Sequence, residues 1–140
     1  MVGILVTIGA LLGATVIGLV WQRRAGVLRA GDPAAPDAIR LTTADLGGPL
    51  GERATLVQFS SAFCAPCRAT RRTLEEVAHM VDGVRHVDID AESRLDLVRQ
   101  VGVLRTPTVL VLDAHGRVVR RGSGAPRKAD VIAALGVVIR

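Results

Sequence analysis

Two cysteines, Cys64 and Cys67, are the residues of this chain best suited to chemistry, and the sequence contains no others. They form Cys-Ala-Pro-Cys, directly after the apolar run 54–59 and at the expected start of a helix. Two intervening residues bring both sulfur atoms within bonding reach once a helix begins. The positive end of the helix dipole favours a thiolate at Cys64, which we expect to be the nucleophile. Cys67, one turn further and more buried, is expected to resolve a mixed disulfide.

Other uses of the cysteine pair remain open from the sequence alone. Zinc would need further ligands, but the three histidines, His79, His86 and His115, are scattered without ligand spacing. Two thiolates can hold copper(I), so a metal-binding module without catalytic turnover is an alternative function. A purely structural disulfide is a third reading, although closing so short a loop adds little stability. The motif and its position between a strand and a helix favour redox chemistry, and we assign no metal ligands.

The elements that must position the cysteines follow from the apolar pattern. Continuous or alternating apolar runs predict strands, and apolar residues three and four apart predict helices. Pro66 and Pro126 each lie where the first turn of a helix tolerates a missing N–H group. The expected elements are strands at 54–59, 84–89, 108–112 and 117–121, and helices at 65–81, 92–101 and 126–135. This order predicts an α/β domain over residues 41–140, with a mixed sheet flanked by helices.

The N-terminal residues are far more apolar than this domain and lack its charged side chains. Residues 1–22 carry no charged side chain, and residues 2–20 are almost wholly apolar. About 20 such residues cross the hydrocarbon core of a bilayer, and Trp21 then lies where interfacial aromatics are enriched. No basic residue precedes the apolar run, as a signal peptide would require. We therefore predict a retained single-pass anchor at residues 1–22, which contacts membrane lipid through residues 2–21.

Two further expectations concern the anchor and the segment after it. Gly9 and Gly13 form a G-x-x-x-G pattern, which allows two helix backbones to approach closely, so the anchor could form a dimer through this face. Small residues are also simply common in membrane helices. Residues 23–40, which include Pro33 and Pro36, lack apolar periodicity and predict a semi-extended linker.

The charge of the chain bears on its partners and its topology. The formal net charge is +5, from 18 Lys+Arg against 13 Asp+Glu. No basic run exceeds two residues and only 2% of the chain is aromatic, so we expect no nucleic-acid partner. Arg23, Arg24 and Arg29 all follow the span. The positive-inside rule therefore favours a cytoplasmic domain on the cell membrane.

From about residue 41 to 135, the chain resembles the thioredoxin superfamily. The resemblance rests on TLVQFSSAFCAPCR, GVLRTPTVLVLDAHGRVV and GSGAPRKADVIAAL. Together with the predicted anchor, it implies a membrane-anchored thiol–disulfide oxidoreductase that acts on protein disulfides without an organic cofactor and receives electrons from an upstream reductase. A small residue and proline between the cysteines resemble the reducing members of the superfamily. The resemblance also implies that Pro107 is cis and assigns the substrate-binding surface to Phe63, Pro66, Thr106, Pro107 and Gly124.

Departures from the family pattern concern proton transfer and topology. Phe63 replaces a frequent tryptophan, Gln58 matches a buried aspartate of thioredoxins, and His86 matches a lysine often paired with that aspartate. Gln58 cannot titrate, so the Cys67 proton would leave through water or through His86. Arg68 adds a positive charge near the thiols. The anchor is also similar to those of tethered reductases that serve extracytoplasmic proteins, so an extracytoplasmic domain remains the alternative placement.

Overall fold

Five strands form one mixed sheet in the order β1-β5-β4-β2-β3. The computed structural model describes residues 1–31 and 38–140. Strands β2 and β3 are parallel, and the other neighbours are antiparallel. The strands are β1 Arg29–Ala30, β2 Ala54–Ser60, β3 Val84–Asp90, β4 Thr108–Asp113 and β5 Val118–Ser123. The helices are α1 Val2–Arg24, α2 Thr43–Leu46, α3 Ala65–Met80, α4 Leu95–Val101 and α5 Lys128–Val138. The predicted thioredoxin-like α/β fold, with a mixed sheet flanked by helices, is confirmed.

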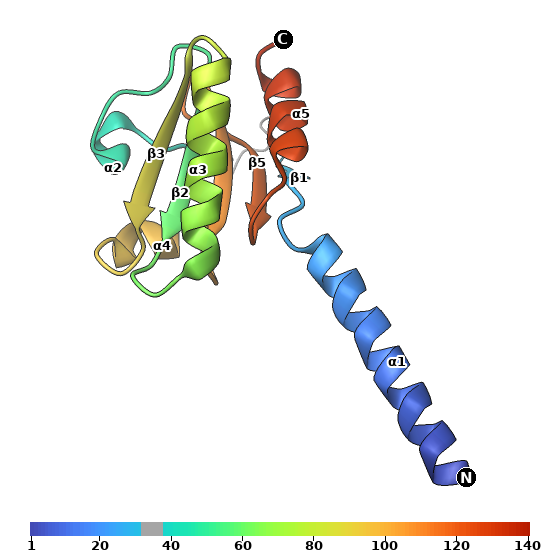
Figure 1. Cartoon of the computed structure of the whole chain (residues 1–140). Helices are drawn as coiled ribbons and strands as arrows, with labels where there is room; N and C mark the ends of the chain where they lie inside the picture. Colours follow the sequence, from blue (N-terminus) through green and yellow to red (C-terminus); the bar gives the residue numbers. More distant parts are fainter. Residues whose placement is uncertain (32–37) are drawn as a thin grey trace.

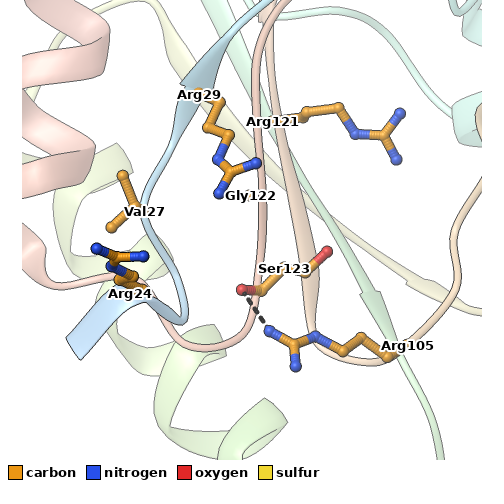
Figure 2. A pocket seen from close by; sticks show the side chains of 7 residues that line it. All are labelled: Arg24, Val27, Arg29, Arg105, Arg121, Gly122 and Ser123. Atoms are coloured by element: carbon orange, nitrogen blue, oxygen red, sulfur yellow. Dashed lines mark hydrogen bonds between the residues drawn. The ribbon is translucent and has the colours of Figure 1, made fainter. Parts of the chain in front are cut away.

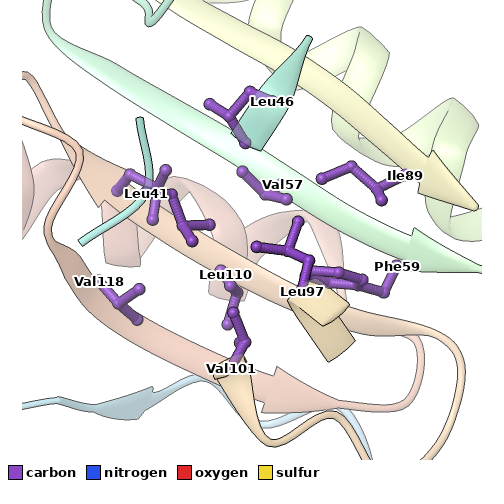
Figure 3. Packing of buried hydrophobic residues seen from close by; sticks show 10 residues of the cluster. Leu41, Leu46, Val57, Phe59, Ile89, Leu97, Val101, Leu110 and Val118 are labelled. Atoms are coloured by element: carbon purple, nitrogen blue, oxygen red, sulfur yellow. The ribbon is translucent and has the colours of Figure 1, made fainter. Parts of the chain in front are cut away.

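Helices cover both faces of the sheet, which explains why its central strands are apolar on both sides. Figure 1 shows α3 and α5 side by side on one face, with α4 on the other. Alternate residues of β2 point to opposite faces. Leu56 packs in the cluster under α3 and α5, whereas Val57 and Phe59 pack with Leu97 of α4 (Figure 3). Every residue of β2 is buried, so the chain enters the cysteine loop from a fixed strand.

Helix α1 stands apart from the sheet. Its residues are exposed, and the helix projects away from the rest of the chain (Figure 1). Among the described residues it is the one helix long and apolar enough to cross a membrane. A signal sequence near the N-terminus can meet the same criteria of length and apolar character, so the anchor at residues 1–22 stays a prediction. No neighbour lies within 4 Å of where a Cβ would stand at Gly9 or Gly13, and that face of the helix is open.

Part of the segment predicted to be a linker belongs to the sheet. Arg29 and Ala30 pair with Arg121 and Arg120 as strand β1, so the linker prediction is wrong for these two residues. The unpaired N–H and C=O groups of β5 make its edge a template for a further strand, whatever the side chains of that strand. The predicted linker also contains residues 32–37, with Pro33 and Pro36, which lie outside the described residues.

Two smaller differences arise from local hydrogen bonds. Helix α4 begins at Leu95 instead of the predicted residue 92, because the Asp90 carboxylate accepts the N–H of Glu92 at 3.0 Å and forms a turn. Helix α2 was not predicted. It is held by a capping box in which Thr42 and Asp45 bond each other's backbone N–H groups. The pattern Thr-x-x-Asp is the sequence signal that marks its start.

Candidate active site

The two cysteines are joined by a disulfide at the start of α3. Cys64 is the N-cap residue of the helix and Cys67 lies in its first turn, with Cα atoms 5.3 Å apart. Pro66 lies beside them within the first turn, where its missing N–H group leaves no hydrogen bond unmade. Cys64 is partly exposed, whereas Cys67 is only 2% exposed. An incoming sulfur atom can therefore approach Cys64 more readily than Cys67.

The loop before β4 lies against the cysteine loop. The peptide bond between Thr106 and Pro107 is cis. The hydroxyl groups of Ser61 and Thr106 are 2.9 Å apart, which connects the two loops. Gly124, at φ +94°, donates its N–H to the Pro107 carbonyl at 2.7 Å. The structure thus brings together three residues, Thr106, Pro107 and Gly124, that the resemblance had assigned to substrate binding.

Exposed apolar side chains flank this site. A depression of about 560 Å³ is lined by residues that include Phe63, both cysteines and Arg68. Phe63 is fully exposed, and Leu104, in the loop before the cis peptide bond, is 95% exposed. Leu104 was not singled out from the sequence, and it lies three positions before Pro107. An exposed aromatic side chain beside a disulfide suits contact with a polypeptide segment.

Beneath the disulfide lies a layer of buried polar side chains. Gln58 is fully buried, and its Nε2 donates to the Cys67 carbonyl at 2.8 Å. Its Oε1 is buried without a hydrogen-bond partner among the described residues, as is Nε2 of His86. In the parallel β2–β3 register, Leu56 pairs with His86 and Gln58 with Asp88, so His86 lies on the same sheet face as Gln58. Within residues 1–31 and 38–140, no hydrogen bond connects His86 to Gln58 or to a cysteine.

An ion pair lies next to this layer of polar side chains, and it was not predicted from the sequence. The Arg71 guanidinium on α3 pairs with the Asp88 carboxylate on β3, with Nε to Oδ2 at 2.8 Å. The Ser60 hydroxyl donates to the same carboxylate. The partners in these contacts are 17 or more residues apart in sequence, so no local sequence pattern predicts them. The pair fixes α3 over the sheet close to the cysteines.

Burial also sets the protonation state of His86. Desolvation lowers the pKa of His86 and outweighs the nearby carboxylates of Asp88 and Glu75, which raise it. The imidazole is therefore neutral at pH 7 and able to accept a proton. Since the unfolded chain binds this proton near pH 6.5, the folded state binds fewer protons below that pH.

Acidification should therefore destabilise the protein through His86. We expect the unfolding temperature to fall as the pH drops through about 6.5 toward the lowered folded-state pKa of His86. Thermal unfolding of the full-length chain in detergent, followed by circular dichroism, measures this. The His86→Leu variant should lose the dependence, whereas His79→Gln, which changes an exposed histidine, should retain it. Equal pH profiles for His86→Leu and the parent would contradict the assignment.

Fold and site together define a thiol–disulfide oxidoreductase, because a Cys-x-x-Cys disulfide lies at a helix start on a mixed sheet, and its loop is hydrogen-bonded to the loop that contains a cis proline. The thioredoxin family model matches residues 49–136. The chain belongs to the thioredoxin family, and its enzymatic class is that of thioredoxin-like protein-disulfide oxidoreductases.

Two relatives and two solved structures illustrate the similarity. A thioredoxin of Alicyclobacillus acidocaldarius subsp. acidocaldarius is 32% identical over 64% of this chain and 86% of its own. A thioredoxin of Griffithsia pacifica is 28% identical over 55% of this chain and 71% of its own. The crystal structure of chloroplastic thioredoxin z has a TM-score of 0.56 at 26% identity, covering 62% of this chain and 79% of its own. A mutant thioredoxin from Halobacterium salinarum NRC-1 has a TM-score of 0.60 at 19% identity, covering 79% and 97%, and supports the fold.

Proposed function

We propose that this protein is a membrane-tethered reductant of protein disulfides that uses Cys64 and Cys67. The observation that carries the proposal is the disulfide between a partly exposed N-cap cysteine and a cysteine 2% exposed in the same helical turn. This difference in access assigns attack to Cys64 and resolution to Cys67. The N-terminus of α3, together with the Arg68 side chain in the same depression, stabilises the Cys64 thiolate.

The reaction proceeds in two exchanges from the dithiol form. The Cys64 thiolate attacks one sulfur of the substrate disulfide, forms a mixed disulfide, and releases the other substrate sulfur as a thiolate. Cys67 then loses its proton, and its sulfur attacks that of Cys64. This forms the intramolecular disulfide and releases the second substrate thiolate. The two cysteines supply two electrons to the substrate; Cys67 gives up one proton in the second exchange, and the other proton comes from solvent.

The substrate segment lies between the two loops in this proposal. Backbone groups of Thr106 and Pro107 align it, Gly124 leaves room beside the Pro107 carbonyl, and Phe63 and Pro66 contact its side chains. The exposed Leu104 adds a further apolar contact. An upstream reductase returns two electrons to the disulfide, so the protein needs no organic cofactor of its own.

Activity and metal binding distinguish this proposal from its alternative. The purified full-length chain in detergent should catalyse dithiothreitol-dependent reduction of insulin, followed by turbidity. The reduced protein should not form a stoichiometric copper(I) complex that survives competition with a strong thiol chelator. Stoichiometric copper binding without insulin reduction would instead favour a tethered metal-binding module. The Cys64→Ala variant controls for thiol-independent turbidity.

The side of the membrane on which the domain lies is a separate prediction. The arginines that follow α1 favour the cytoplasm. An impermeant thiol reagent added to intact, dithiothreitol-treated cells should therefore leave Cys64 unlabelled, and should label it after the cells are broken. A variant with a serine-to-cysteine change in a known extracytoplasmic loop of another protein reports that the reagent works. Labelling of Cys64 in unbroken cells would place the domain outside the cytoplasm, as the similarity to extracytoplasmic reductases implies.

Dimerisation through Gly9 and Gly13 remains part of the proposal for the anchor. Helix α1 has no buried residue, and the two glycines form an open face on which a second helix could pack.

A further inference from the structure

Basic side chains from three separate segments line a cavity where α1 meets the sheet. The cavity has a volume of about 280 Å³, enough for a group several times the size of a water molecule at about 30 Å³. Figure 2 shows Arg24 from the end of α1, Arg29 from β1 and Arg105 from the loop before the cis peptide bond around it. The residues lining it, all within the described part of the chain, include no aspartate or glutamate.

A fourth arginine holds the wall of the cavity. The Arg121 guanidinium donates to the carbonyl groups of Val101 and Gly102 at 3.0 and 3.1 Å, at the end of α4. Arg105 donates from Nη2 to the Ser123 carbonyl at 3.2 Å (Figure 2), which fixes its position while leaving further N–H groups to donate. Three positive charges gathered without a lining carboxylate repel one another, and an anion between them would relieve that repulsion.

The cavity lies where a membrane anchor would enter the lipid headgroups. Arg24 is the last residue of α1, and Trp21, one turn earlier, is exposed. The end of α1 is tied to the sheet, because Gly26 donates its N–H to the Ser123 carbonyl at 2.6 Å. At Gly26 (φ +84°) a Cβ would stand 2.2 Å from the Ala125 carbonyl oxygen, so helix end and loop are in close contact. The end of α1 and the cavity are therefore held together.

We propose that Arg24, Arg29 and Arg105 bind the phosphate of an anionic lipid headgroup. This inference rests on the proposed tethering through α1. Guanidinium groups suit the ligand because their planar N–H donors pair with two phosphate oxygens at once. Occupation of this cavity would hold the loop that carries Arg105 and the cis peptide bond close to the bilayer. The substrate-binding side of the domain then works near the membrane surface.

Trp21 reports the lipid at this position, since it is the only tryptophan of the chain. The full-length protein is reconstituted into vesicles that contain equal fractions of phosphatidylcholine and phosphatidylglycerol, one of them brominated on its acyl chains. We expect brominated phosphatidylglycerol to quench Trp21 more strongly than brominated phosphatidylcholine does. The ratio of the apparent affinities of the two lipids at this position should be at least about fivefold, because one arginine near an anionic membrane contributes about that factor. The Arg29→Gln and Arg105→Gln variants should each lose most of this preference. Arg23→Gln, which removes the same charge outside the cavity, should lose clearly less of it, because only the general attraction of that charge to the anionic surface is removed.

The possible outcomes test the proposed headgroup site separately from the proposed tethering through α1. No quenching by either lipid would mean that α1 is not in the bilayer, and the tethering itself would fail. Equal quenching by both lipids, or equal losses in Arg23→Gln and Arg105→Gln, would overturn the headgroup site and leave the tethering intact. Loss of the preference on adding millimolar inorganic phosphate, but not sodium chloride of the same ionic strength, would assign the cavity to soluble phosphate and overturn the lipid source.

Discussion

The Cys67→Ser variant is expected to accumulate a covalent complex with its substrate, whereas Cys64→Ser should accumulate none. Both variants should lose insulin reduction down to the uncatalysed rate. The reason is positional, because Cys64 is partly exposed at the N-cap of α3 and Cys67 is buried one turn further along. Without Cys67, the mixed disulfide on Cys64 lacks the internal thiol that would resolve it.

A peptide with a single disulfide makes the difference measurable. The full-length variants are incubated with it, quenched in acid and analysed by non-reducing electrophoresis and mass spectrometry. Ala65→Ser is the matched control, since it places a hydroxyl between the cysteines at an exposed position and keeps both thiols. It should turn over and trap nothing. A complex trapped by Cys64→Ser and not by Cys67→Ser would show that the two roles are reversed.

The central strands of the sheet were predictable because burial on both faces leaves a local signal in the sequence. Strands β2 and β4 are buried on both faces, so their sequences are continuous apolar runs that no surface strand would carry. Strand β1 has two residues, an exposed arginine and an exposed alanine, and it exists because the edge of β5 offers hydrogen-bonding groups. No pattern in the chain encodes such a pairing. The linker prediction failed there for this reason.

The site also has parts that local sequence predicts and parts that depend on tertiary contacts. The Cys-Ala-Pro-Cys spacing and its place after an apolar strand pointed to the disulfide and its helix without any tertiary information. The contact of Ser61 with Thr106 spans 45 residues, and that of Gln58 with the Cys67 carbonyl depends on how α3 packs over β2. The residues involved could be named through family resemblance, but their hydrogen bonds required the fold. The arginine cavity combines three distant segments; in the sequence, Arg24 and Arg29 indicated only the topology of the anchor, and Arg105 was not singled out.

Replacing Gln58 with aspartate is expected to raise the rate of insulin reduction several-fold. Gln58 lies fully buried below the resolving cysteine, with its amide bonded to the Cys67 carbonyl at 2.8 Å. This amide cannot take the Cys67 proton, and no titrating side chain is hydrogen-bonded to Cys67 within the described residues. A carboxylate at this position supplies a general base where the resolving step needs one.

The same substitution should cost stability in a pH-dependent way. The variant loses the amide donor and places a carboxyl group at a fully buried position, at a cost of about 1–3 kcal/mol. Burial raises the pKa of such a carboxyl in the folded state above its unfolded value of about 3.9. The folded state then binds more protons between these two pKa values, so the stability deficit grows as pH rises through that window. The rate gain should grow over the same range, because only the ionised carboxylate accepts a proton.

Comparison with Gln58→Asn separates the effect of the new general base from the effect of the shorter side chain. Asparagine has the length and shape of aspartate and does not titrate, so its loss of stability relative to the parent should not change with pH in this window, and its rate should not rise. Insulin reduction and thermal unfolding of both full-length variants, measured across about pH 5 to 8, give the two profiles. Equal rates for Gln58→Asp and Gln58→Asn would mean that proton removal from Cys67 does not limit turnover. The proton would then leave through water or through the neutral His86 imidazole as fast as the exchange itself proceeds.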